Sequence, residues 1–193
     1  MKKLLTLALV LLTYGAVGQI SGGVKAGVNV SNFTGATFQN ATQKALIGYH
    51  AGGLLNFKLG AVALQPELLV SASGAKIERS GLTQNYKLTY ATIPVMVQLD
   101  LGGFYLEGGP QLGFKISESI PDQTIENFGK GLDLAAGVGL GYRSSMGLGF
   151  GLRYLVGLSK VGDFNPTTQQ NPDFKHSTIQ AGIFLMVGGK KKD

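Results

Sequence analysis

Residues 131–142 read GLDLAAGVGLGY, and residues 147–159 read GLGFGLRYLVGLS. In both stretches an apolar side chain stands at every even-numbered position, from Leu132 to Tyr142 and from Leu148 to Leu158. The odd-numbered positions hold mainly glycine, with Asp133 and Arg153 among them. Side chains alternate between two faces along a β-strand, whereas a helix repeats about every 3.6 residues. The two stretches therefore predict strands with one apolar face and one small or polar face.

The same alternation recurs through the chain after residue 22. It predicts eight strands, at residues 23–31, 47–57, 62–73, 87–99, 104–115, 132–142, 148–158 and 178–187. In the fourth segment the apolar phase includes Tyr90 and then resumes at Ile93, which predicts a β-bulge near Thr92. The length suits a single domain.

The connections between these strands alternate in length. Long polar segments occupy 32–45, 74–86, 116–131 and 159–175, and tight turns occupy 58–61, 100–103 and 143–147. Long connections at one end and short turns at the other are typical of an outer-membrane β-barrel. The pattern predicts an all-β fold, an eight-stranded antiparallel up-and-down transmembrane β-barrel with both termini on the short-turn, periplasmic side.

Alternation alone would also fit a soluble, exported, lipocalin-like ligand-binding barrel. A soluble exterior carries many charges, but here the non-apolar phase is dominated by glycine, which suits a narrow lumen. Aromatic residues stand near both ends of the apolar phase, as in the two interfacial girdles of a membrane barrel. Those near the short turns are Phe57, Phe104 and Tyr142, and those near the long connections are Tyr49, Tyr90 and Phe114. We therefore expect the apolar face to contact outer-membrane lipid.

Composition excludes several other classes. The chain has 17 Lys and Arg against 11 Asp and Glu, but the excess lies at its two ends, so no clustered basic face for nucleic acid is expected. The absence of cysteine excludes disulfides and cysteine-based sites, and two histidines do not make a convincing metal site. We expect no cofactor.

Residues 1–18 have the form of a signal peptide. Two lysines precede a short apolar run, and AVG at 16–18 supplies small residues before the expected cleavage site. The run is too short to span a bilayer as a helix. We expect export with cleavage after Gly18, a barrel over residues 19–187 and a basic periplasmic tail over residues 188–193.

Several stretches resemble the PorT-like outer-membrane β-barrel domain family of Gram-negative bacteria. The most specific are QPEL at 65–68, IP at 93–94 and GGPQ at 108–111, and the likeness covers nearly all of the chain after residue 18. The resemblance implies an eight-stranded barrel in the outer membrane and raises a role in a secretion complex. It implies no settled activity.

Five charged residues fall on the lumen phase of the predicted strands: Lys25, Glu67, Glu107, Asp133 and Arg153. Because an isolated buried charge is costly, we expect these side chains to pair, with Arg153 bonded to Glu67 or Glu107. Such a network predicts a structural plug, although a gate for small solutes is an alternative. A general porin is disfavoured, since eight strands enclose little free space.

The sequence offers one further chemical alternative, a rim enzyme acting on membrane lipid. Ser71 and Ser73 lie near the long-connection end of one predicted strand and His176 near that end of another, but no orienting acid is evident. His50 is expected to be a packed lumen residue. We therefore predict no catalytic residues, and a structural, anchoring or recognition role through the long connections or within an envelope assembly.

Overall fold

The computed structural model describes residues 19–34, 42–79, 82–119, 132–158 and 175–188. These residues form eight strands: β1 (Gln19–Thr34), β2 (Thr42–Leu59), β3 (Val62–Arg79), β4 (Leu82–Leu101), β5 (Phe104–Ser119), β6 (Leu132–Arg143), β7 (Leu148–Gly157) and β8 (Lys175–Gly188). Each strand pairs antiparallel with its sequence neighbours, and β8 pairs with β1 to close the barrel. The predicted fold class is confirmed. In the described part of the chain, no helix is long and apolar enough to cross a membrane.

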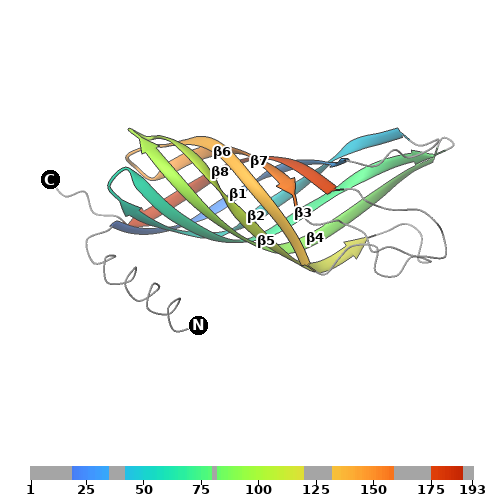
Figure 1. Ribbon diagram of the computed structural model, residues 1–193, viewed down its shortest axis with the longest axis horizontal. Helices are drawn as coiled ribbons and strands as arrows, with labels where there is room; N and C mark the ends of the chain where they lie inside the picture. Colours follow the sequence, from blue (N-terminus) through green and yellow to red (C-terminus); the bar gives the residue numbers. More distant parts are fainter. Residues whose placement is uncertain (1–18, 35–41, 80–81, 120–131, 159–174, 189–193) are drawn as a thin grey trace.

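Figure 1 shows that β1 begins and β8 ends at the same end of the barrel as the short turns. Glycines with positive φ angles stand in these turns, with Gly60 at 64° and Gly147 at 86°. The β4–β5 turn has two such glycines, Gly102 and Gly103, whose N–H groups donate to Asp100 Oδ1 at 3.1 and 3.2 Å. The left-handed backbone that tight turns require is open to glycine at little steric cost.

Most strands extend beyond their predicted ends. The clearest case is residues 74–86, which were expected to form a long connection. Instead β3 continues to Arg79 and β4 begins at Leu82, with the two strands paired to their ends. Main-chain ladder bonds do not require apolar side chains, so strands continue where the apolar alternation has stopped. At the other end, Gly188, expected to begin the tail, is the last residue of β8. Residues 1–18 and 189–193 lie outside the described residues.

The predicted bulge at Thr92 is wrong. The β3–β4 register runs without a shift from Leu69↔Thr92 to Arg79↔Leu82. The shift lies between β4 and β5, where Thr89 pairs with Ser117 and Tyr90 with Lys115, so the additional residue is in β5. Because β4 keeps its phase, Tyr90 is only 9% exposed and does not belong to the outer girdle.

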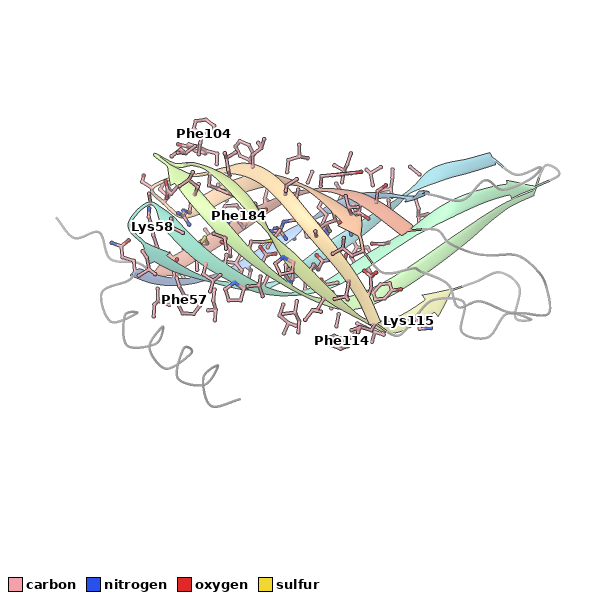
Figure 2. All side chains as sticks on the ribbon, viewed as in Figure 1. Phe57, Lys58, Phe104, Phe114, Lys115 and Phe184 are labelled. Carbon is pink, nitrogen blue, oxygen red and sulfur yellow. The ribbon has the colours of Figure 1, made fainter. Side chains whose placement is uncertain are left out.

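The other strands place their faces as predicted. Exposed apolar residues from every strand cover the exterior, among them Val24, Leu55, Leu68, Val97, Leu106, Val138, Leu152 and Ile183. Figure 2 shows Phe57 and Phe104 pointing outward near the short-turn end and Phe114 pointing outward near the other end. The interior is not filled by glycine alone. Leu54, Tyr105, Phe184 and Met186 form a buried apolar cluster inside the barrel.

Candidate functional site

Four of the predicted lumen charges come from alternate strands. Lys25 lies on β1, Glu67 on β3, Glu107 on β5 and Arg153 on β7, and all four are buried. The register places Gly139 of β6 directly between Glu107 and Arg153. A Cβ atom at Gly139 would lie 2.9 Å from Glu107 Oε1, closer than real Cβ contacts allow. Glycine at this position therefore gives the Glu107 carboxylate room to reach Arg153.

Arg153 contacts both glutamates. Its NH1 and NH2 groups donate to Glu67 Oε2 and Oε1 at 3.1 and 2.8 Å, and its Nε donates to Glu107 Oε1 at 2.8 Å. The pair with Glu67 is bidentate, the geometry in which a planar guanidinium matches a carboxylate. Since β3 and β7 lie on opposite sides of an eight-stranded barrel, this pair crosses the lumen.

Three amide side chains complete a closed ring of hydrogen bonds. Gln65 Nε2 donates to Glu67 Oε1 at 2.8 Å, and Gln98 Nε2 donates to Glu107 Oε2 at 3.1 Å. Asn56 Nδ2 donates to the side-chain oxygens of both glutamines at 3.0 Å. The circuit consists of Asn56, Gln65, Glu67, Arg153, Glu107 and Gln98, and we call it the lumen ring.

Lys25 lies against the lumen ring, with its Nζ 3.4 Å from both carboxylate oxygens of Glu67. The two cations, Lys25 and Arg153, balance the two anions, Glu67 and Glu107, so the buried group carries no formal net charge. Arg153 is only 2% exposed. Side chains from β1, β3, β5 and β7 thus meet inside the barrel and close the lumen at this level.

Asp133, the fifth predicted member, occupies another part of the lumen. It is buried on β6 beside Gly113, where an added Cβ atom would lie 3.4 Å from Asp133 Cβ and 3.5 Å from Tyr90 Cδ1. This region is nearer the long-connection end, and Asp133 is not a member of the lumen ring. Sharing the inward phase places residues in the lumen without fixing their height along it.

The sequence reasoning missed the three amides of the lumen ring. Asn56, Gln65 and Gln98 all stand on the inward phase of predicted strands. A buried amide needs hydrogen-bond partners, and charged groups on the same phase supply them. The inward amides were therefore a usable signal.

A second polar group surrounds His50. Asn29 Nδ2 donates to Ser71 Oγ at 3.0 Å, and Asn29 Oδ1 lies 2.7 Å from His50 Nδ1. Within the described ranges, His50 Nε2 has no hydrogen-bond partner. The imidazole lies against two glycines, since an added Cβ at Gly27 would be 2.6 Å from His50 Cε1 and one at Gly182 would be 2.9 Å from Nε2. His50 is a packed lumen residue.

These contacts do not form a Ser–His pair between Ser71 and His50. His50 and Ser71 are register partners on β2 and β3. His50 Nδ1 is bonded to Asn29, and His50 Nε2 has no hydrogen-bond partner within the described ranges, so His50 is not bonded to the Ser71 hydroxyl. Ser73 is on β3 and His176 is on β8, two strands separated in the barrel by β1 and β2; the His176 side chain lies outside the described residues. In the described segments, no group of three or more His, Asp or Glu residues could hold a metal ion.

The exterior defines the class of the protein. At the short-turn end, the Tyr142 ring lies 5.0 Å from that of Phe104 and 6.1 Å from that of Phe150, measured between ring centroids. Tyr49 and Phe114 are exposed toward the other end. An apolar band between aromatic residues, around a lumen closed by polar side chains, is the surface of a transmembrane β-barrel and not of a lipocalin-like soluble one.

Comparison with known proteins agrees with this class. Residues 18–163 match the family described as "Outer membrane protein beta-barrel domain", and the chain belongs to that family. The family supports a location in the outer membrane. No curated protein matches the sequence.

Two solved structures share the fold. Neisserial surface protein A superposes with a TM-score of 0.57 at 11% identity, covering 85% of this chain and 96% of that one. Ail, the attachment invasion locus protein of Yersinia pestis, solved with the heparin analogue sucrose octasulfate, superposes with a TM-score of 0.53 at 15% identity, covering 88% of this chain and 99% of that one. At these identities the likeness concerns the fold alone.

Proposed function

We propose that this protein is a non-enzymatic outer-membrane barrel that acts through its ends, as a structural, anchoring or recognition element. The observation that carries the proposal is the lumen ring. Arg153 and Glu67 meet across the barrel with almost no exposure to solvent. A barrel closed in this way does not serve as an open conduit, so its contacts with other molecules are made outside the lumen.

The lumen ring fits a fixed plug better than a gate. Glu67 Oε1 accepts hydrogen bonds from Arg153 and Gln65, and Glu107 accepts from Arg153 and Gln98. Opening the lumen would separate several of these bonds at once and leave buried charges without partners. Breaking a buried ion pair by losing one partner costs about 3–5 kcal/mol. We therefore assign Lys25, Glu67, Glu107 and Arg153 a structural role.

The partners in this proposal are outer-membrane lipid, which covers the apolar exterior, and other envelope proteins. The PorT-like resemblance extends the second class to a secretion assembly. Nucleic acid is not among the proposed partners. Export through a cleaved signal peptide at residues 1–18 belongs to the same proposal, and the mature chain would begin at Gln19.

Conductance in a planar lipid bilayer tests the closed lumen. The purified wild-type protein is expected to give no steady ionic current. The doubly neutralised variant Glu67→Gln with Arg153→Met removes the central pair and is expected to give measurable current if the plug is the barrier. A steady wild-type current would overturn the proposal.

The enzymatic alternative is tested on lipid. Mass spectra of outer-membrane lipids from cells with and without the protein are expected to be identical. A loss or gain of acyl chains that depends on the protein would show that it is an enzyme. Affinity purification from native membranes would then identify the envelope partners that a non-enzymatic role requires.

A further inference from the structure

A polar cavity of about 770 Å³ opens at the short-turn end of the barrel. Its lining includes Ser21, Asn56, Lys58, Asp100, Arg143 and Ser145. Figure 2 shows Lys58 at this end, far from Lys115 near the other. Asn56 also belongs to the lumen ring, so the cavity reaches inward as far as the plug.

Asp100 organises the charged wall of this cavity. Its Oδ2 atom lies 2.6 Å from Lys58 Nζ and 2.9 Å from Arg143 NH2. Its Oδ1 atom accepts the two N–H groups of the β4–β5 turn. Both carboxylate oxygens are therefore occupied, and the position of Asp100 is fixed by the turn and by its two cations.

The cluster has more donors than strong acceptors. The NH1 group of Arg143 has Met186 Sδ as its partner, at 3.7 Å, and a thioether sulfur is a weak acceptor. The Lys58 side chain is 34% exposed, so part of its ammonium faces the cavity. Among the described residues of this wall, two cations share one carboxylate, which leaves one surplus positive charge and N–H groups without a strong acceptor.

We propose that this cavity binds the free C-terminal carboxylate of a peptide, with Lys58 and Arg143 as the charged donors. One negative charge balances the surplus positive charge. A phosphate group carries nearly two negative charges. The fixed Asp100 carboxylate would therefore repel it more strongly than it repels a singly charged carboxylate. Ser144, Ser145 and Asn56 line the same space. The side-chain oxygens of Ser144 and Asn56 can accept hydrogen bonds from peptide N–H groups, while their donors are already bonded to Leu148 and to the two glutamines. The volume lies in the range of pockets that enclose small ligands.

Titration calorimetry on the full-length protein in detergent micelles tests this site. The probes are trialanine with a free carboxylate, the same peptide with a C-terminal amide, and inorganic phosphate. The free peptide is expected to bind at least about tenfold more tightly than the amide, because the amide loses the charge-assisted bonds. Equal affinity of peptide and amide would overturn the proposal, as would tighter binding of phosphate or no binding of the free peptide.

Substitutions then assign the binding to the two cations. Arg143→Gln and Lys58→Gln are each expected to lower the affinity for the free peptide by about tenfold or more. Lys58→Arg keeps the positive charge and is expected to keep most of the affinity. Lys115→Gln, which removes a cation at the opposite end, is the matched control and should bind as the wild type does. Wild-type affinity in folded Arg143→Gln and Lys58→Gln proteins would overturn the assignment.

Amide shifts in the wild-type protein give an independent readout that needs no variant. The free peptide is expected to move the NMR signals of Gly102, Ser144 and Gly147, which lie around the cavity, and not those of Gly113 near the other end. If the peptide moved the signal of Gly113 and left those of Gly102, Ser144 and Gly147 unchanged, the site would lie elsewhere and the proposal would be contradicted.

Discussion

Arg153 concentrates most of the charge interactions in the lumen. It donates to Glu67 through two nitrogens and to Glu107 through the third. Removing the guanidinium would leave two buried carboxylates whose remaining partners among the described residues are Lys25 and two amides. At the scale of the residue, therefore, the plug depends on one cation more than on any single anion.

Arg153→Met is expected to destabilise the barrel by about 3–5 kcal/mol, because both carboxylates stay behind in a closed lumen. Adding Glu67→Gln or Glu107→Gln to Arg153→Met should in each case recover part of the loss. The larger coupling energy with Arg153 is expected for Glu67, because only the Glu67 pair is bidentate. Urea unfolding in lipid vesicles, analysed as double-mutant cycles, measures both couplings. Coupling energies near zero for both glutamates would contradict the bonded geometry.

Glycine beside the lumen ring gives a second test at this scale. A Cβ atom at Gly139 would lie 2.6 Å from Leu152 O and 2.9 Å from Glu107 Oε1, so Gly139→Ala is expected to destabilise by about 1–3 kcal/mol. Gly108→Ala on β5 is the matched control, since its nearest neighbour would be 3.7 Å away. Unfolding free energies compare the two, and equal values would show that the lumen relaxes around the added methyl group.

At the scale of the strand, alternation decides which side chains meet lipid. Leu68 is 62% exposed in the middle of β3, and Leu101 is 56% exposed at the end of β4 beside a short turn. The two leucines have similar exposure, yet they differ in depth because one lies mid-strand and the other at a strand end. A charged side chain on the lipid face costs far more free energy at the bilayer midplane than near the interfaces.

Leu68→Arg is expected to cost about 2–4 kcal/mol of folding free energy in lipid, and Leu101→Arg about 0–1 kcal/mol. Val138→Arg, on the exposed face of β6, should behave like Leu68→Arg. Refolding into vesicles at graded urea concentrations gives each value. If the leucine-to-arginine change were tolerated equally at both positions, the assignment of the lipid face would fail.

Alternation made the strands, their faces and the inward set of charges predictable, because each follows from a two-residue period. The strand ends were not predictable in this way, since ladder bonds continue past the apolar band to Arg79 and Leu82. Tyr90 was misplaced because an aromatic residue fits either face. The partners of Arg153, and the separate position of Asp133, depend on register and side-chain reach across the lumen, which a periodic pattern does not contain.

At the scale of the whole molecule, the two ends of the barrel differ in kind. The short-turn end has glycine turns, the Asp100 cluster and the polar cavity. β1 begins and β8 ends there. The strands β1, β3, β5 and β7 all end at the other end of the barrel. A barrel that is closed in its middle therefore presents two independent surfaces, and its orientation decides which surface meets the periplasm and which meets the exterior.

We expect the short-turn end to face the periplasm, because outer-membrane barrels have short periplasmic turns and longer external connections. The chain has no cysteine, so a single introduced thiol reports its own side of the membrane. In intact cells, a membrane-impermeant maleimide is expected to label Asn40→Cys, Thr124→Cys and Thr168→Cys. The same reagent should reach Leu59→Cys and Ser145→Cys only after the outer membrane is permeabilised. Labelling of the second set in intact cells, with the first set protected, would reverse the orientation and place the carboxylate-binding cavity on the cell surface.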